Sequence, residues 1–222
     1  MKKQLVSFRD FLKTGTLGPV IPGMKMIEIA EAFGAPDDWI TKYAETIPVY
    51  WIYGQLEASF DNEPPHDLNW FQIEHVHAIR GKTERITDQF ALSMDGFDSR
   101  TKPSEFLNAG LWTPEEAMVF YIASRNDIDL NICAGPIQIY FRVDTDFIED
   151  RDAEKYLNGV TVSQLISDID HRTEIDSVYS YSHPAIEQIT NAIDWKSISG
   201  RNYLNFARQK VAAPMKKGPQ AP

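Results

Sequence analysis

The chain has 222 residues, of which 43% are hydrophobic and 24% are charged, a composition typical of a folded protein with a buried core. Lysine and arginine total 22 against 32 aspartate and glutamate residues, which gives a formal net charge of −10. This charge argues against a nucleic-acid backbone as the main ligand, whereas it favours encounter with a basic protein. Solubility alone also explains an acidic surface.

The single cysteine, Cys133, lies inside the apolar run "DLNICAGPIQIYF". A disulfide within the chain is excluded, so a reducing compartment is the simpler expectation. We expect Cys133 to be a small buried hydrophobe rather than a nucleophile. The sequence contains neither a secretory signal nor an apolar run of about 18 residues, the length needed to span a membrane. We therefore predict a cytoplasmic protein without a membrane segment.

The first clear periodicity predicts a helix ending at Phe33. Met26, Ile29 and Phe33 recur at helical spacing, and Gly34 follows where a left-handed C-cap is expected. Pro36 prevents the helix from continuing. The next two residues, Asp37 and Asp38, are adjacent acids beside a tryptophan. We interpret them as turn residues rather than as a catalytic pair, because adjacent turn acids rarely have separated pKa values.

Strand periodicity follows. Alternation predicts strands over Val49–Tyr53 and Leu56–Phe60, with Gly54 at the hairpin corner. We expect a third strand within residues 68–79 and a fourth within residues 86–95. The sheet is predicted to be antiparallel, because these strands are joined by short connections.

A similar pattern recurs in the second half. The sequence "FLKTG" (11–15) is echoed by "FLNAG" (106–110), and "GQLEASF" (54–60) by "GPIQIYF" (135–141). In "TPEEAMVFYIAS" (113–124), a capping box and an early proline predict a helix. We predict two diverged helix-plus-sheet repeats, over residues 1–100 and 101–150; two unrelated units of the same kind are the alternative.

The C-terminal part is predicted to be helical. Apolar residues recur at helical spacing within residues 161–172 and 182–193, which indicates two helices in a segment spanning 151–210. We expect the acids around His171 to be solvated. Residues 211–222 combine three prolines with no apolar period, which predicts a flexible tail.

Two histidines give the only metal pattern that we find. His75 and His77 are alternate residues of a predicted strand, so both imidazoles would project from one face and could share a zinc ion, with Glu74 or Asp67 nearby. A third ligand at suitable spacing is missing. We therefore predict no metal, and a half-exposed sheet face or a pH-sensitive contact surface instead. The sequence carries no nucleophile elbow, phosphate loop, dinucleotide fingerprint or C-x-x-C pair, so we predict no catalytic residue and no cofactor.

The first quarter of the chain resembles a loose set of small bacterial proteins. Their pattern is an LGP-x-x-x-GM lead, a helix closing in LG-x-P-D-D and a strand reading Y-G-x-L-E-x-x-F. The matching positions here are Gly18, Pro19, Gly23, Met24, Gly34, Pro36, Asp37, Asp38, Tyr53, Gly54, Leu56, Glu57 and Phe60. Phe33 replaces the usual leucine. The helix-turn-strand unit is also similar to the β-lactamase-inhibitor-like fold, in which helices pack on an antiparallel sheet. The resemblance implies an immunity or antitoxin type of protein and no catalytic residue.

These observations predict an α+β fold with helices packed on an antiparallel sheet, two repeats and a helical C-terminal segment. The predicted function is a non-catalytic, protein-binding one: an immunity or antitoxin-type inhibitor of a cognate toxin or other enzyme. A metal-dependent hydrolase using His75 and His77, and a structural interaction module, are the alternatives. The predicted partner-binding residues lie on one sheet: Tyr50, Trp51, Tyr53, Glu57, Trp70, Glu74 and His75.

Overall fold

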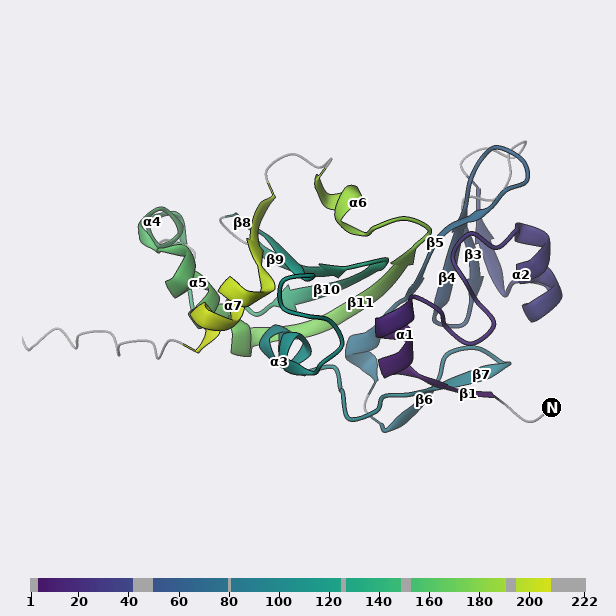
Figure 1. Ribbon diagram of the computed structural model, residues 1–222, viewed down its shortest axis with the longest axis horizontal. Coiled ribbons are helices and arrows are strands. Elements are labelled where there is room, and N and C mark those ends of the chain that lie inside the picture. Colours follow the sequence, from purple (N-terminus) through teal and green to yellow (C-terminus); the bar gives the residue numbers. More distant parts are fainter. Residues whose placement is uncertain are drawn as a thin grey trace, which may run out of the picture.

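The computed structural model describes residues 4–41, 50–79, 81–124, 127–148, 153–190 and 195–208. These residues form an α+β fold with seven helices and two sheets, as predicted (Figure 1). The helices are α1 (Phe8–Thr14), α2 (Met26–Phe33), α3 (Pro103–Asn108), α4 (Ala153–Gly159), α5 (Val162–Ile169), α6 (Ile186–Thr190) and α7 (Gly200–Ala207). Two short 3₁₀ turns are η1 (Val76–Ala78) and η2 (Asp170–Arg172).

The large sheet has nine strands in the order β12-β8-β9-β10-β11-β5-β4-β3-β2, and every neighbouring pair is antiparallel. Its strands are β2 (Asp38–Ile40), β3 (Tyr50–Tyr53), β4 (Leu56–Phe60), β5 (Leu68–Ile73), β8 (Met118–Ser124), β9 (Asp127–Ala134), β10 (Ile137–Val143), β11 (Thr173–Tyr181) and β12 (Lys196–Ser199). The pairing of β11 with β5 joins strands from the two halves of the chain into one sheet.

A small sheet holds the strand predicted within residues 86–95. It consists of β1 (Gln4–Ser7), β7 (Phe90–Ser93) and β6 (Thr83–Arg85), in the order β1-β7-β6. Strand β1 runs parallel to β7, which is the one parallel pairing in the described residues. This strand therefore does not extend the large sheet.

Two layers cover the large sheet unequally. Figure 1 shows α1, α3 and the small sheet on one side of β10 and β11, and α6 on the other. The main core fills the first side: the Phe11 ring of α1 stacks on Phe71 of β5 at 5.7 Å, and Phe106 of α3 meets Phe141 of β10 at 5.9 Å. We call the opposite side, which carries Glu57, the outer face.

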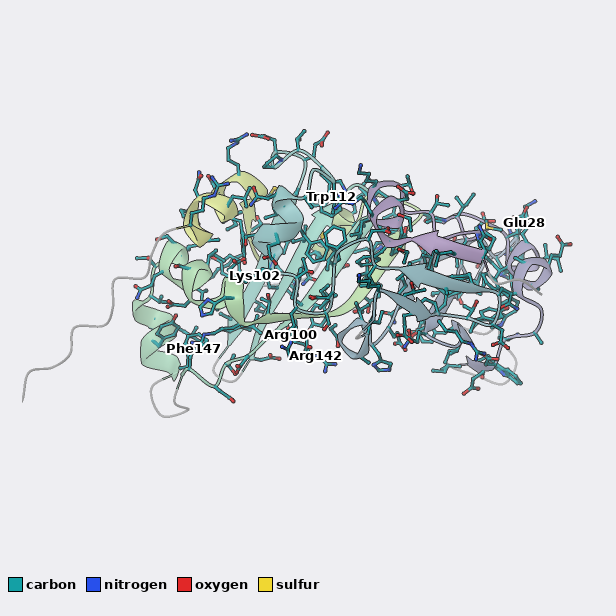
Figure 2. The ribbon with its side chains drawn as sticks, turned by 90° about the horizontal axis from the view of Figure 1, so that it is seen from below. Glu28, Arg100, Lys102, Trp112, Arg142 and Phe147 are labelled. Carbon is teal, nitrogen blue, oxygen red and sulfur yellow. The ribbon has the colours of Figure 1, made fainter. Side chains whose placement is uncertain are left out.

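The core is shared by both halves of the chain. One cluster of buried apolar side chains runs from Val6 through Phe71 and Phe141 to Leu204. Figure 2, which shows the molecule from below, places Glu28 of α2 and Phe147 of the loop after β10 at opposite ends, with Trp112 between them. The Trp112 Nε1 donates a hydrogen bond to the Leu12 carbonyl of α1 at 3.2 Å, which ties the second half to the first.

The helix predicted to end at Phe33 is confirmed. Helix α2 spans Met26–Phe33, buries Ile29 and Phe33, and ends at Gly34, whose φ is 81°. The helices expected within 161–172 and 182–193 are also present, as α5 and α6. The predicted tail, residues 211–222, lies outside the described residues.

Two expectations about helices are wrong. Residues 113–116 do make the capping-box bond, in which Thr113 N–H donates to Glu116 Oε2 at 2.8 Å, but a turn and strand β8 follow instead of a helix. The run of Val119, Phe120, Tyr121 and Ile122 explains this, since β-branched and aromatic residues fit a strand that is buried on both faces. The C-terminal segment is not wholly helical either, because β11 occupies the centre of the large sheet.

Among the described residues, no helix is both long enough and apolar enough to cross a membrane.

Candidate functional site

A row of side chains crosses the outer face where the two halves meet. The strand register places Glu57 of β4 opposite Gln72 of β5, Gln72 opposite Tyr179 of β11, and Tyr179 opposite Gln138 of β10. Directly opposed residues on neighbouring antiparallel strands have Cβ atoms about 4.5–5.5 Å apart. An acid, two amides and a phenol therefore form one continuous line across four strands.

Aromatic rings run beside this row. Trp70 of β5 lies opposite Tyr181 of β11, and its ring contacts Tyr50 and Tyr179, each at 5.6 Å between centroids. The rings of Tyr179 and Tyr181 stack at 5.9 Å with an interplanar angle of 11°. We call Tyr50, Trp70, Tyr179 and Tyr181 the aromatic stripe. It covers the seam between β5 and β11.

A pocket of about 360 Å³ opens at the end of the stripe, toward α6. Its walls are aromatic rings and polar side chains, and none of them carries a full charge. The lining residues are Trp70, Asn131, Gln138, Tyr140, Tyr179, Tyr181, Gln188 and Trp195. Aromatic walls with a few placed polar groups are typical of binding sites, which measure about 300–1,000 Å³.

Hydrogen bonds fix the polar floor of this pocket. Gln138 donates from Nε2 to the Asn131 Oδ1 at 2.7 Å, and its Oε1 accepts from the Tyr181 hydroxyl at 2.8 Å. The Tyr140 hydroxyl donates to an oxygen of Asp129 in a short bond. Each of these side chains therefore has a fixed orientation before any ligand arrives.

Next to the stripe, two carboxyl groups share one amide. Gln72 Nε2 donates to Glu57 Oε2 at 2.9 Å and to Glu74 Oε1 at 3.0 Å. Burial raises the pKa of the Glu57 carboxyl to about 7, and its bond to the Glu74 carboxyl adds to the rise. We call Glu57 and Glu74 the acid pair. Because Glu57 has its pKa near neutrality, the pair exchanges a proton in the physiological pH range.

Carboxylates lie on two sides of the pocket, and one of them, Asp176, forms an ion pair with Arg142 of β10. Burial raises the pKa of the Tyr179 hydroxyl, and the charges of Glu57, Glu74 and Asp176 raise it further. Burial likewise raises the pKa of Tyr140, and Asp129 adds to the effect. Burial is the larger cause for both phenols, and the neighbouring carboxylates add to it.

The structure brings together four of the seven predicted partner-binding residues. Tyr50, Glu57, Trp70 and Glu74 lie on the outer face. Trp51 and Tyr53 do not, because they alternate with Tyr50 along β3 and point to the core side of the sheet. There the Trp51 ring packs on the Phe60 ring, with 4.9 Å between centroids. Tyr53 is only 3% exposed and donates from its hydroxyl to the Gly34 carbonyl.

The strand argument for a zinc site at His75 and His77 is wrong. Strand β5 ends at Ile73, His75 has a left-handed backbone with a φ of 55°, and η1 follows. Alternate projection from a strand therefore does not apply to this pair. The His75 side chain is 66% exposed, with its Nε2 4.0 Å from Glu74 Oε2, whereas the side chain of His77 lies outside the described part. Within the described residues, no three metal-ligating side chains gather.

The two acids after α2 have structural partners. Asp37 accepts a hydrogen bond on Oδ2 from the Gly54 N–H of the β3–β4 hairpin at 2.8 Å, and Asp38 accepts from the Trp39 N–H at 2.8 Å. Asp38 begins β2, so the predicted turn ends one residue earlier than expected. Cys133 is 2% exposed, as predicted, and burial raises the pKa of its thiol to about 12.

A second hollow, of about 480 Å³, lies beside β6 and β7. Three charged residues line it: Lys82, Asp95 and Asp98. Asp95 accepts bonds from the hydroxyls of Ser7 and Ser93, each at 2.6 Å, and from the Arg9 N–H. Although burial acts in the opposite direction, these bonds lower the pKa of Asp95. The carboxylate thus joins the start of α1 to the end of β7, which is a structural role.

Sequence reasoning missed most of the pocket. Asn131, Gln138, Tyr140, Tyr179 and Tyr181 belong to strands of the second half, whereas the predicted surface used only the first. A signal was present in "SVYSY", where Ser177, Tyr179 and Tyr181 alternate with a period of two. The pairing of β11 with β5, which brings these tyrosines to Trp70, has no local signal.

Comparison with protein-family models, curated proteins and solved structures gave no significant match to this chain. The class that the fold defines is therefore an α+β protein built on one nine-stranded antiparallel sheet.

Proposed function

We propose that this chain is a non-catalytic protein-binding protein of the cytoplasm, most concretely an immunity or antitoxin-type inhibitor of a cognate toxin or other enzyme. The observation that carries the proposal is the outer face, where the aromatic stripe adjoins the acid pair and lines a preformed pocket. Tyrosine and tryptophan dominate binding energy at protein interfaces, because they supply large rigid contact area together with a polar tip.

The charge of the chain supports a basic partner. The formal net charge is −10, and the acid pair places two carboxyl groups directly beside the stripe. Complementary charge speeds encounter and suppresses wrong partners. Both the faster encounter and the rejection of wrong partners favour an inhibitor that must find one toxin quickly.

The arrangement of the acid pair favours binding over catalysis. Hydrolytic carboxylates act from two sides of the bond that they break, about 5 Å or more apart in glycoside hydrolysis. Here Glu57 and Glu74 bond to the same Gln72 Nε2 and to each other. A substrate bond does not fit between groups that are already in contact, whereas a cation can approach both together.

We also propose that the two halves are diverged copies of one unit. In each half a glycine with positive φ (Gly54 at 62°, Gly135 at 55°) opens a strand whose register shifts just before a buried phenylalanine, Phe60 or Phe141. From the β11–β5 seam, strands β11 to β8 and strands β5 to β2 each form a meander running outward, and β12 adds an edge strand beside β8. On this proposal the second unit reaches β11, beyond the predicted boundary at residue 150, and the outer face lies where the two copies meet.

Affinity purification from the native host tests the function. Wild-type bait should retain a specific partner, and Trp70→Ala should lose it, because Trp70 belongs to both the stripe and the pocket. Trp39→Ala is the matched control, since Trp39 is 57% exposed on β2 and pairs with Trp51 on the core side of the sheet. The retained partner, if it is an enzyme or toxin, should lose activity when the purified chain is added. Equal retention by both variants contradicts the proposal.

A further inference from the structure

We infer that the pocket and the acid pair together receive an arginine side chain of the partner, with the guanidinium over the rings of Trp70 and Tyr179 and its N–H groups directed at Glu57 and Glu74. This assignment rests on the proposed function and names the chemistry of its partner at the site.

The charges around the pocket favour a cation. None of the eight lining residues of the pocket is basic, while carboxylates flank it on both sides. Glu57 and Glu74 stand next to Tyr179 through Gln72, and Asp129 bonds to Tyr140. Arg142 of β10 is paired with Asp176, so it does not offset Glu57, Glu74 or Asp129. A cation is stabilised beside these carboxylates, whereas an anion is repelled.

The aromatic walls of the pocket suit a guanidinium in shape and in electronic character. Trp70, Tyr179 and Tyr181 are in mutual ring contact, and Trp195 adds another ring to the lining. The negative face of an aromatic ring attracts a cation within about 6 Å of its centroid, and tryptophan does so best. A planar guanidinium stacks on these faces, while the compact, strongly hydrated ammonium of lysine does not. The rings therefore favour arginine over lysine.

The side-chain oxygen of Gln72 is a buried acceptor without a donor among the described residues. The Gln72 side chain is buried, at 6% exposure, and its amide nitrogen bonds to both members of the acid pair. Its Oε1 is buried and accepts no hydrogen bond from the described part of the chain. A buried polar atom left unpaired is unfavourable, and a guanidinium offers five N–H donors in a fixed fork. Two carboxyl groups and one amide oxygen make an acceptor set that suits this fork.

Nuclear magnetic resonance of the purified chain gives a direct test, because the five tryptophans supply five indole N–H signals. The probe is N-acetyl-arginine amide, and the matched control is N-acetyl-citrulline amide, which has nearly the same shape but no charge. We expect the arginine probe to shift the signals of Trp70 and Trp195 and to leave those of Trp39, Trp51 and Trp112 in place. A single side chain without the rest of its protein should bind with a Kd on the order of 1 mM. The citrulline probe should bind at least about fivefold more weakly, since it lacks the charge.

Two charge variants locate the site. Glu57→Gln keeps the shape of the acid pair and should weaken the arginine probe about fivefold or more, because a charge-assisted bond is lost. Glu31→Gln removes the same charge from an exposed position of α2, on the core side of the sheet, and should leave the Kd unchanged. The ionisable side chains that face Glu57 are Glu74 and His75 after β5, and Tyr179 on β11. Wild-type affinity should rise from pH 6 to pH 8 as Glu57 loses its proton, and Glu57→Gln should flatten this rise.

The outcomes separate the inference from the proposed function. Equal shifts by the arginine and citrulline probes, or shifts by methyl glucoside instead, overturn the inference and identify a neutral ligand, even if Trp70→Ala abolishes partner capture. A Trp70 signal that ignores the arginine probe overturns it as well. If the arginine probe binds as expected while Trp70→Ala leaves partner capture unchanged, the proposed function fails, and the assignment of the arginine to a partner fails with it.

Discussion

The Asp37 carboxylate joins two elements that are 17 residues apart, because it accepts the N–H of Gly54 at the corner of the β3–β4 hairpin. We expect Asp37→Ala to lower the free energy of unfolding by about 0.5–2 kcal/mol, the usual cost of losing such a bond. Urea unfolding followed by fluorescence measures this. Asp38→Ala is the control and should cost less, because the Asp38 carboxylate accepts from the N–H of the adjacent Trp39 and does not join two distant elements. A variant of Asp37 with unchanged stability but lost partner binding would show that the acid is functional.

Gly54 itself illustrates how one backbone position fixes a hairpin. Its φ is 62°, and a Cβ atom there would overlap the carbonyl oxygen of Ile86. Gly135 has a φ of 55° but open space around it. We expect Gly135→Ala to cost about 1–2 kcal/mol, the penalty for a left-handed backbone, and Gly54→Ala to cost clearly more. Thermal unfolding of the two variants compares them directly, and equal costs would mean that the loop at Ile86 moves away freely.

The raised pKa of Glu57 makes stability depend on pH. Since the folded-state pKa is about 7 and the ordinary value 4.5, the folded protein binds more protons than the unfolded chain between these values. The free energy of unfolding should therefore fall as the pH rises from about 4.5 to about 7. Glu57→Gln mimics the protonated form, so it should reduce this fall and be more stable than the wild type at pH 8. Denaturant titrations at pH 5 and pH 8 check this, and an unchanged pH dependence would contradict it.

At the scale of elements, a buried carboxylate holds two helices to the end of α5. Asp170 of η2 accepts bonds from the Ser104 N–H at 3.0 Å, from the Ser104 hydroxyl at 2.7 Å and from the Tyr203 hydroxyl at 3.0 Å. The expectation of solvated acids around His171 is thus wrong for Asp170, which is 7% exposed. The sequence offered no sign of it, because Ser104 lies 66 residues away.

Removing Asp170 should therefore be costly. We expect Asp170→Ala to lower the free energy of unfolding by about 2–4 kcal/mol, because the donors of Ser104 and the fully buried Tyr203 lose their acceptor. Asp168→Ala in the same segment removes a carboxylate that accepts from the Tyr156 hydroxyl at 2.6 Å on a half-buried surface. It should cost about 1 kcal/mol. Similar losses for the two variants, measured by urea unfolding, would contradict the role of Asp170.

Local patterns predicted those elements whose signals are local. Helix α2 ends at Phe33 as predicted and strand β4 matches its predicted bounds, because a 3.6-residue or two-residue period and an adjacent glycine define them within about ten residues. Strand β8 was predicted as a helix because the bond between Thr113 and Glu116 forms in either case. The segment becomes a strand because β8 is buried between β9 and β12, and this pairing depends on residues far along the chain. The same holds for the site residues. The strand patterns around Tyr50 and Trp70 predicted these two residues, whereas Tyr179 and Tyr181 reach them only through long-range strand pairing.

At the scale of the whole molecule, the continuous sheet predicts that the two halves unfold together. The β11–β5 pairing and the shared core leave neither half with a closed core of its own. We expect thermal unfolding followed by tryptophan fluorescence and by far-ultraviolet circular dichroism to give one coincident transition. Phe141→Ala, which opens a cavity in the second half, should lower both midpoints equally. Two separated transitions would indicate that the units are independent domains.

Cross-linking in the native host shows directly whether the outer face of the large sheet binds the partner. A photoreactive phenylalanine analogue replaces Tyr50 of the aromatic stripe in one variant and Leu5 in another, since Leu5 is 61% exposed on the small sheet at the opposite side. After irradiation in the native host, we expect the Tyr50 variant to be joined covalently to the partner that affinity purification retains, and the Leu5 variant not to be. Cross-linking of that partner through Leu5 alone would show that the outer face is not the binding surface.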